Sequence, residues 1–335
     1  MGVDRRRSGP LRGRRGRHRR GRDPQARRGS GIVTARRARA RPGGLLVLPY
    51  AVADGARNMA VDEAMLELAA GGSTLLRFYG WDPWCLSLGR HQTAPERLLG
   101  RSPDDLRPGV DAVRRPTGGR SVFHGPEITY AFACPARAWG GPRAVLQTLH
   151  GALAEGLRSV GVPLDTVQGD DAQASLAAAS RISAASCFRD PAPGELTARG
   201  RKLVGSAQCR RRGGVLQHGS ILLEDRQRLG DLDGGDVGPE ESAAAGVSGK
   251  GPAIGLNELL DPLPDPRLIV ESLSVSVASA FGAPATAATK APAGIATSAA
   301  LTHLAAGYER IHRAGAWLWL RERPLPPLDG PADRF

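Results

Sequence analysis

Two side chains of uncommon type stand close together in the stretch ASCFRDPAPGELTARGRKLVGSAQ, residues 185–208. Cys187 is one of four cysteines, and Lys202 is one of only three lysines among 46 basic residues. A thiol acts as a nucleophile when a nearby positive charge stabilises its thiolate. A lysine ammonium is a compact charge on a flexible stem, and it fits where a planar guanidinium does not. The stretch therefore allows two interpretations: the lysine stands here by chance, or its amine has a role that a guanidinium could not fill.

The residues alone offer two candidate nucleophiles. Cys209 precedes three consecutive arginines, but those arginines are expected in an exposed hairpin turn, where water screens their charge. Cys187 is expected on a loop, where functional side chains concentrate. Cys85 and Cys134 fall on strand-like segments and are expected in the core. The choice between Cys187 and Cys209 stays open at this level.

A glycine-containing segment, RRPTGGRSVFH at 114–124, provides a second candidate site. Because they lack side chains, Gly118 and Gly119 allow backbone N–H groups to approach an anion or a carbonyl oxygen closely. Arg115 could pair with a phosphate. The same residues also suit a simple turn between strands, and His124 and His218 can equally be packed histidines. The segment by itself therefore indicates a turn and does not identify a ligand.

The elements that must position these residues mix helices with strands. Ile128, Tyr130, Phe132 and Cys134 alternate with smaller residues, which places them on one face of a strand. Two carboxylates, Asp62 and Glu63, are expected in the first turn of a helix at 58–71. Further helices are expected at 143–160 and 298–313, strands at 74–81 and 85–92, a strand–turn–strand–turn–strand unit over 113–134, a hairpin over 202–223, a loop at 229–253 and a linker at 283–300. This order predicts an α+β fold with mostly antiparallel strands.

Charge is distributed very unevenly along the chain. The net charge of the 335 residues is +13, but residues 1–42 hold 16 arginines and 2 aspartates, so the remainder is close to neutral. A segment with so few large apolar residues cannot offset its chain entropy, and we expect 1–43 to form a disordered Arg-rich extension. Nucleic-acid binding by the rest of the chain receives no support from its charge.

We expect neither export nor membrane insertion. The arginine-rich start lacks the apolar core of a signal peptide. The apolar run LLVLPYAV at 45–52 is far too short to span a bilayer. The four cysteines form no CxxC pair and no zinc-type spacing. These features predict reduced thiols, no metal site and a cytoplasmic location.

Eight segments taken together resemble a known family. In chain order they are NMAVDEAML, LRFYGWDPWCLSLGRHQ, RRPTGGRSVFH, ITYAF, SCF, EL, GRKLVGSAQ and LQHGSILL. They are similar to the lipoate/octanoate protein ligase–transferase family, which shares its catalytic fold with the biotin protein ligases. The resemblance implies a catalytic domain of that fold at 44–265, with a mixed, mostly antiparallel sheet and flanking helices. Residues 266–335 are then expected to be a linker and a small C-terminal helical segment.

The branch of the family is indicated by particular residues. Arg120 stands where ATP-dependent lipoate ligases usually carry a third glycine. The Ser-Cys-Phe around Cys187, followed by Glu195 and Lys202, is similar to the LipM-type octanoyltransferases, in which this cysteine carries the acyl group. The resemblance thus places the nucleophile at Cys187. It implies an acyltransferase of lipoate biosynthesis that needs no cofactor and moves an octanoyl group from acyl carrier protein to a lysine of the glycine-cleavage H protein or another lipoyl domain.

The expected substrate site combines these segments. Lys202 is expected to stabilise the Cys187 thiolate and the developing oxyanion, with backbone N–H groups at 205–207 completing an oxyanion hole. Leu203, Val204 and Val122 are expected to line an acyl tunnel. The residues expected to bind substrate are Arg77, Arg115, Gly118, Gly119, His124, Gly205, Ser206 and Ala207.

The implied protein substrates are usually acidic. A local basic patch at Arg114, Arg115 and Arg120 is therefore expected to steer them toward the site.

Other functions remain open. An ATP-dependent lipoate–protein ligase would use ATP and Mg²⁺, and Lys202 would then contact the phosphate of an acyl-adenylate. A non-catalytic module that binds acyl carrier or lipoyl domains would have no need for Cys187 and Lys202. A nucleic-acid binder acting through the basic tail predicts salt-sensitive retention that disappears when residues 1–42 are removed.

Overall fold

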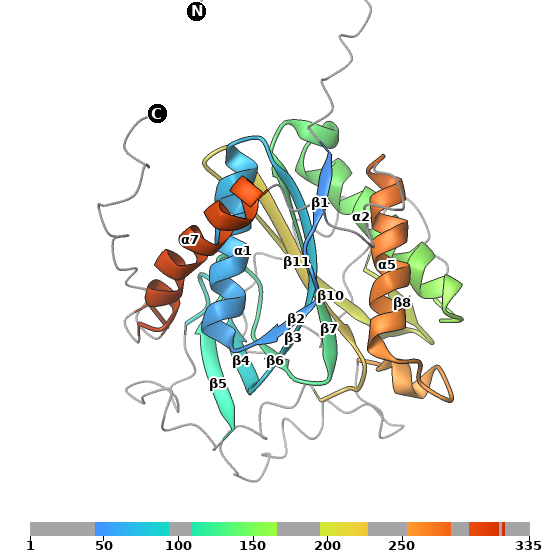
Figure 1. The fold of residues 1–335 in the computed structure, drawn as a ribbon. Helices are drawn as coiled ribbons and strands as arrows, with labels where there is room; N and C mark the ends of the chain where they lie inside the picture. Colours follow the sequence, from blue (N-terminus) through green and yellow to red (C-terminus); the bar gives the residue numbers. More distant parts are fainter. Residues whose placement is uncertain are drawn as a thin grey trace, which may run out of the picture. The chain divides into compact units, whose positions relative to one another are not determined.

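A mixed sheet forms the centre of the molecule (Figure 1). The computed structural model describes residues 44–93, 109–165, 195–226, 253–282, 295–314 and 317–318. The sheet has the order β1-β3-β7-β11-β10, and β2 also pairs with β3. β1 and β2 run parallel to β3, whereas β3, β7, β11 and β10 are antiparallel neighbours. The strands are β1 (Leu45–Val47), β2 (Ala51–Ala53), β3 (Thr74–Trp81), β7 (Glu127–Pro135), β10 (Val204–Arg211) and β11 (Gly214–Leu222).

Two smaller sheets carry further parts of the candidate site. In the first, β4 (Trp84–Leu88) lies between β5 (Val110–Arg114) and β6 (Val122–His124). In the second, β8 (Thr197–Ala198) pairs with β9 (Arg201–Lys202). The strand expected at 85–92 ends at Leu88, because the chain turns there and the N–H of Arg90 donates to the carbonyl of Thr117 at 2.7 Å.

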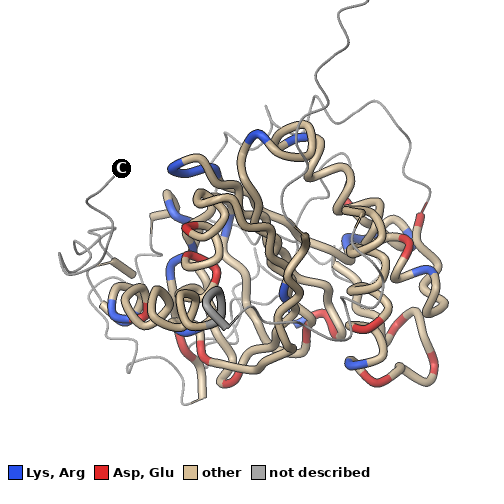
Figure 2. Tube along the Cα trace, turned by 45° about the horizontal axis from the view of Figure 1, so that its top comes forward, with Lys and Arg blue, Asp and Glu red and all other residues tan. Residues whose placement is uncertain are grey.

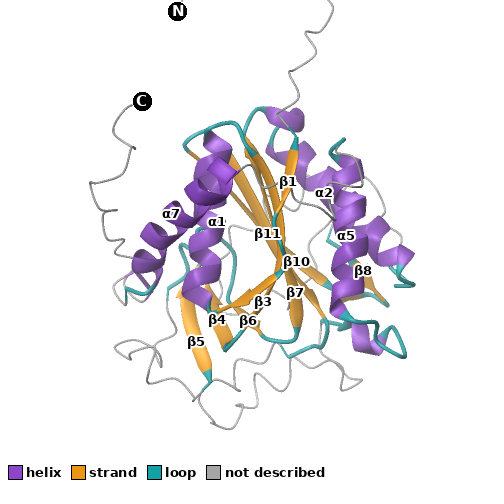
Figure 3. Cartoon of the chain, in the orientation of Figure 1, coloured by secondary structure: helices purple, strands orange, loops and turns teal. Residues whose placement is uncertain are grey.

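Helices cover both faces of the large sheet (Figures 1 and 3). On one side lie α1 (Gly55–Ala70) and α7 (Ile295–His312), which pack against each other. On the other side lie α2 (Pro142–Ser159) and α5 (Pro266–Ala280). Short 3-10 helices occur at Ala138–Gly140 and Leu256–Glu258. The α+β architecture expected from the sequence, with a mixed sheet and flanking helices, is confirmed.

The alternation in β7 explains why the sheet has a core on each face. Tyr130 and Phe132 belong to the hydrophobic cluster that α2 and α5 complete. Ala131 and Ala133 belong to the cluster on the α1 side, where small residues let the helix approach closely. Burial of each large apolar side chain contributes about 1.5–3 kcal/mol. Both faces of the strand are therefore buried, as its sequence pattern predicts.

Helix α1 begins earlier than expected. The Asp54 carboxylate accepts a hydrogen bond from the N–H of Arg57 at 2.8 Å, and this N-cap starts the helix at Gly55. Asp62 and Glu63 consequently lie in the middle of the helix and not in its first turn, and both are fully buried. The prediction that Asp62 and Glu63 lie in the first helical turn, near the positive end of the helix dipole, was wrong. These carboxylates instead serve as partners for buried cations.

The hairpin expected at 202–223 is present with a tighter turn. β10 continues to Arg211, so Cys209 lies within the strand and not in the turn. The turn consists of Arg212 and Gly213, both with positive φ (50° and 91°), as in type I′ hairpin turns. Arg211 is not an exposed turn residue, because it forms an ion pair with the buried Glu63 at 2.5 Å.

The helices that follow residue 265 contribute to the same cores as the sheet. Leu273 and Val277 of α5 are fully buried in the cluster that contains β7 and α2. Tyr308 and Ile311 of α7 pack against α1. The Arg114 side chain is fully buried and donates to the carbonyls of Trp317 and Leu318 at 3.0 and 2.9 Å. The division of the chain at residue 265 stays a prediction, as do the Arg-rich extension, the loop at 229–252 and the linker before residue 295, which lie outside the described residues.

Charged side chains of both signs are spread over the described part of the chain. Figure 2 shows that the central strands carry few of them and that most lie on helices and connecting segments. Among the described residues, no helix is long and apolar enough to cross a lipid bilayer.

Candidate functional site

A narrow cavity lies between the large sheet and the segment that leads into β6. Its volume is about 30 Å³. Arginine, histidine and hydroxyl groups share its wall with aromatic and apolar side chains and with glycine backbone. The lining residues are Met59, Tyr79, Trp81, Arg115, Val122, His124, Thr129, Gly205, Ser206, Ala207, His218, Gly219 and Ser220. A concave site with a few convergent polar groups is the usual form of a small-molecule pocket.

The Arg115 guanidinium lines the cavity and organises the segment 115–121, which leads to Val122 in the cavity wall. It donates to the carbonyl and hydroxyl oxygens of Ser87 at 2.9 and 2.6 Å. It also donates to the carbonyls of Gly118 and Arg120 at 3.3 and 2.7 Å. The segment therefore curls around its own arginine, which is 4% exposed. The residue that follows β4 restrains the same segment. A Cβ at Gly89 would lie 1.9 Å from the Gly119 carbonyl oxygen, so only glycine allows the two backbones to approach this closely.

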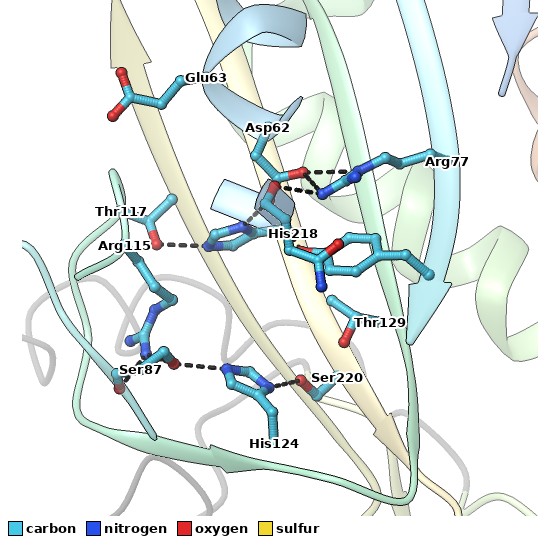
Figure 4. A network of polar contacts seen from close by, with 12 residues as sticks. Asp62, Glu63, Arg77, Ser87, Arg115, Thr117, His124, Thr129, His218 and Ser220 are labelled. Carbon is cyan, nitrogen blue, oxygen red and sulfur yellow. Dashed lines mark hydrogen bonds and ion pairs between the residues drawn. The ribbon is translucent and has the colours of Figure 1, made fainter. Parts of the chain in front are cut away.

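His124 lies between Ser87 of β4 and Ser220 of β11 (Figure 4) and is held by the buried carboxylate of Glu127. Its Nδ1 is 2.7 Å from Glu127 Oε1, and its Nε2 is 2.6 Å from Ser87 Oγ. Its ring stacks on Trp81 with centroids 3.8 Å apart. Burial lowers the pKa of His124, although the neighbouring Glu127 acts in the opposite direction. These contacts fit a neutral imidazole that donates from Nδ1 and accepts at Nε2.

The order Ser87–His124–Glu127 has the residue types of a hydrolytic triad. Ser87, however, is fully buried and is not part of the cavity wall. Its oxygen accepts a hydrogen bond from Arg115, so the hydroxyl links the arginine to the histidine. The arrangement is suited to hold the cavity wall in place and not to supply a serine nucleophile.

A second buried network reaches the same wall from the opposite side (Figure 4). The Asp62 carboxylate accepts from the Arg77 guanidinium at 3.0 Å, from the Tyr79 hydroxyl at 3.0 Å, and pairs with His218 Nδ1 at 2.7 Å. Burial alone would raise the pKa of Asp62, but Arg77, His218 and Tyr79 together hold it below its ordinary value. The far nitrogen of His218 lies 2.7 Å from the hydroxyl of Thr117.

Lys202 lies on β9, directly before the strand that provides the cavity wall. The turn between β8 and β9 is Arg199-Gly200, with φ values of 53° and 71°. Asp165 fixes this turn by accepting both backbone N–H groups, at 3.0 and 2.9 Å. Lys202 is 2% exposed, and its ammonium forms an ion pair with Glu195 at 2.6 Å. The local hairpin thus holds a buried cation three residues before Gly205.

Ser206, on β10, makes side-chain contacts with residues of β7 and α2. Its hydroxyl lies 2.7 Å from the Tyr130 hydroxyl and 2.9 Å from His150 Nε2 on α2. Burial raises the pKa of Tyr130 to about 12, so its hydroxyl stays protonated near neutral pH. His150 is buried on the face of α2 that packs against this strand.

The structure brings most of the expected substrate-binding residues to one place. Five of them line the cavity: Arg115, His124, Gly205, Ser206 and Ala207. Gly118 and Gly119 do not line the cavity, but the carbonyl of Gly118 accepts a hydrogen bond from the lining residue Arg115. Arg77 is not part of the lining either, since its guanidinium contacts Asp62 and the Asn58 carbonyl. These three residues can shape the pocket only through their neighbours.

Two groups of sequence-based expectations need correction. Val122 lines the cavity, but Leu203 and Val204 are fully buried in the core beside α2 and do not line it. The basic patch expected at Arg114, Arg115 and Arg120 does not form, because the first two arginines are buried. Their donors are used for backbone carbonyls, which leaves them unavailable to steer an acidic protein.

The geometry bears on which cysteine can act as a nucleophile. Cys187 lies outside the described residues. Cys85, Cys134 and Cys209 all carry thiols whose pKa is raised by burial, to about 12 for Cys134 and about 11 for Cys209. The Arg211 guanidinium lowers the pKa of Cys209 only in part, because it is already paired with Glu63. The cysteines within the described residues are therefore poor nucleophiles near neutral pH.

Sequence reasoning missed Asp62, Glu195 and His218 as parts of the site. Asp62 lies three residues after Met59 and four before Leu66, so it falls on an apolar helix face. A carboxylate in such a place needs a buried partner, and this was the available signal. His218 and Ser220 alternate on the same face of β11 as one cavity wall. No pattern in the sequence links His218 to Thr117.

Comparison with known proteins points to one family. Residues 54–269 match the family model described as the lipoyl protein ligase A/B catalytic domain. Similar curated proteins include the octanoyltransferase LipM of Kyrpidia tusciae, 41% identical over 177 residues that cover 50% of this chain and 61% of that protein. The octanoyltransferase LipM of an Exiguobacterium species is 36% identical over 214 residues, which cover 61% of this chain and 75% of that protein. The chain thus spans about three fifths of the first of these relatives.

Solved structures show the same fold at low sequence identity. Lipoate–protein ligase A bound with ATP superposes with a TM-score of 0.58 at 17% identity, covering 83% of this chain and 98% of that one. A bipartite lipoate protein ligase from Thermoplasma acidophilum, studied with its E2 lipoyl domain, gives a TM-score of 0.59 at 14% identity, covering 85% and 99%.

Proposed function

Because this chain belongs to the lipoyl protein ligase A/B catalytic-domain family, we propose that it is an octanoyltransferase of lipoate biosynthesis. It moves an octanoyl group from octanoyl-acyl carrier protein to a lysine of the glycine-cleavage H protein or another lipoyl domain. One observation carries the proposal beyond the family: a buried, ion-paired Lys202 directly precedes the strand whose backbone at 205–207 lines the cavity. Relatives named octanoyltransferase support the choice of acyl group.

The first step transfers the acyl group to the enzyme. The Cys187 thiolate attacks the carbonyl carbon of the carrier thioester, a new carbon–sulfur bond forms, the old carbon–sulfur bond breaks, and the carrier leaves as a thiolate. One thioester replaces another, so the step is close to isoenergetic and needs no ATP. Lys202 as an ammonium stabilises the thiolate and the oxyanion of the tetrahedral intermediate. Glu195, at 2.6 Å, holds the ammonium group in position.

Backbone donors can complete the oxyanion site. Among the described strands, β10 pairs only with β11. In an edge strand, every second N–H group points away from the neighbouring strand. Donors of this kind at 205–207 are in reach of a carbonyl oxygen bound in the cavity. Met59, Trp81 and Val122 offer apolar contacts to the acyl chain.

The second step releases the product. The amine of the acceptor lysine attacks the Cys187 thioester, an amide bond forms, and the thiolate is regenerated while the amine loses a proton. The amide is more stable than the thioester, so this step drives the reaction forward. The reaction proposed here uses no cofactor.

The test is the intact mass of the protein after mixing with octanoyl-acyl carrier protein without ATP. We expect wild type to gain one octanoyl group and Cys187→Ser to gain none. Addition of the H protein should then discharge the adduct and increase the mass of the acceptor. No adduct on wild type, together with acceptor modification only when free acid, ATP and Mg²⁺ are supplied, would contradict the proposal.

The second candidate is an ATP-dependent lipoate–protein ligase. It is favoured by the superposition with lipoate–protein ligase A bound with ATP. Arg120 in place of a third glycine argues against it. In the ligase reaction, Lys202 would contact the phosphate of an acyl-adenylate and Cys187 would be dispensable, so Cys187→Ser separates the two enzymes. A non-catalytic binding module would bind the carrier without forming any adduct.

A further inference from the structure

The two buried histidines of the cavity wall are oriented in the same way. Each places one ring nitrogen on a buried carboxylate, Asp62 for His218 and Glu127 for His124, and the other on a hydroxyl. Figure 4 shows the two hydroxyl contacts, to Thr117 and to Ser87. His124 reaches Ser87 and thereby Arg115, while His218 reaches Thr117 directly. The segment 115–121 is thus held at two residues that lie only two positions apart.

The protonation of His218 follows from its partners. Asp62 is fully buried and already accepts from Arg77 and Tyr79, which together favour its ionised form. A carboxylate can only accept, so the proton between Asp62 and His218 belongs to Nδ1 of the imidazole. Its Nε2 lies 2.7 Å from the Thr117 hydroxyl, within hydrogen-bond distance.

Thr117 is well placed to transmit this restraint. Its side chain is fully buried, and its carbonyl accepts from the N–H of Arg90 at 2.7 Å. Arg115 and its contacts to Gly118 and Arg120 lie on either side of it. Loss of the Thr117–His218 bond would leave the segment held mainly from the Arg115 side, and the cavity wall could shift.

We infer that His218 is a positioning residue. By fixing Thr117 and the segment 115–121, it sets the geometry of the cavity that Arg115 lines. Its effect on turnover rests on the proposed function, but the hydrogen bond itself does not. Small displacements of such walls have large kinetic effects because binding and reaction depend on closely defined geometry.

The kinetic test uses Thr117→Val, which keeps the size of the side chain and removes the hydroxyl. We expect KM for octanoyl-acyl carrier protein to rise about tenfold, with kcat changed less than about twofold. Thr117→Ser keeps the hydroxyl and should restore KM. The matched control is Thr74→Val, since Thr74 is a buried threonine whose hydroxyl has no hydrogen-bond partner among the described residues. An unchanged KM in Thr117→Val, or an equal rise in Thr74→Val, would overturn the inference.

A spectroscopic readout separates this inference from the proposed function. In protein labelled with ¹⁵N-histidine, His218 should carry a proton on Nδ1. Its Nε2 resonance should move in Thr117→Val but not in Thr117→Ser or Thr74→Val. No proton on Nδ1, or no movement in Thr117→Val, refutes the positioning role. If the resonance moves as expected but wild type never becomes octanoylated, the proposed function fails while the hydrogen bond stands.

Discussion

At the scale of single residues, Lys202 and Glu195 form a buried ion pair close to the strand that lines the cavity. Both side chains are largely buried, with exposures of 2% and 12%. Removing one partner of a buried pair leaves a charge without compensation, which typically costs about 3–5 kcal/mol. The neighbouring pair Arg201–Glu258 is more exposed, at 15% and 28%. The two pairs provide a matched comparison on adjacent residues.

We predict that Glu195→Gln slows octanoyl transfer about tenfold, equivalent to about 1.4 kcal/mol in the barrier. The amide can still accept a hydrogen bond from Lys202 but no longer forms the ion pair that holds the ammonium group in position. The measurement is the single-turnover rate from octanoyl-acyl carrier protein to the H protein. Glu258→Gln is the control and should transfer at the wild-type rate, because Glu258 pairs with Arg201 and not with Lys202. Equal rates in both variants would rule out a role for Glu195.

Residue identity was largely predictable, but residue contacts were not. The family motifs identify Arg115, His124 and the stretch 205–207, which do line the cavity. They do not reveal that Arg77 acts through Asp62. The reason is physical: the contact joins α1 to β3 and β11, and only the folded sheet brings these elements together.

At the scale of elements, packing between α2 and α5 depends on a glycine. A Cβ on Gly156 would lie 3.0 Å from the backbone of Leu273, so the two helices approach each other closely there. Gly151 lies on the same helix, is exposed, and would meet no atom within 4 Å. The two glycines have the same helical setting but opposite surroundings.

We predict that Gly151→Ala stabilises the protein by about 1 kcal/mol, because alanine is the better helix former. Gly156→Ala should destabilise it by about 1–3 kcal/mol, because the added methyl forces α2 and α5 apart. The measurement is the free energy of unfolding in urea for both variants. Gly156→Ala with a stability equal to that of Gly151→Ala would show that the helices do not pack this closely.

Element boundaries were predicted where the pattern was strong. The strand Thr74–Trp81 and the helix at 143–160 were found almost to the residue. The start of α1 was missed because Asp54 was not recognised as an N-cap. The hairpin turn was drawn too wide because Arg212-Gly213 suffices for a type I′ turn.

At the scale of the whole molecule, the C-terminal region decides how α1 is buried. Tyr308, Ile311 and Trp317 pack against Ala60 and Ala64 of that helix. The carbonyls of Trp317 and Leu318 also accept from the buried Arg114, which directly precedes Arg115. The region after residue 294 is thereby linked to the wall of the candidate site.

We predict that ending the chain after residue 294 lowers the free energy of unfolding by about 5 kcal/mol. This estimate corresponds to the loss of the burial contributed by the three large apolar side chains, at about 1.5–3 kcal/mol each. Octanoyl transfer should also be lost, because Arg114 loses partners beside the site. The measurement is thermal and urea unfolding, with removal of residues 1–39 as a control expected to leave stability unchanged. A stable, active truncated protein would identify this region as an appendage.

The sequence by itself determined the family, the α+β class, the main elements and the cavity-lining motifs. These properties depend on local patterns, such as strand alternation and turn glycines, and on motif order along the chain. The tertiary structure alone decided that Arg114 and Arg115 are buried, that Leu203 and Val204 belong to the core, and that Asp62 and His218 hold Thr117. Burial and hydrogen-bond partners arise between elements far apart in the chain, so no local pattern encodes them.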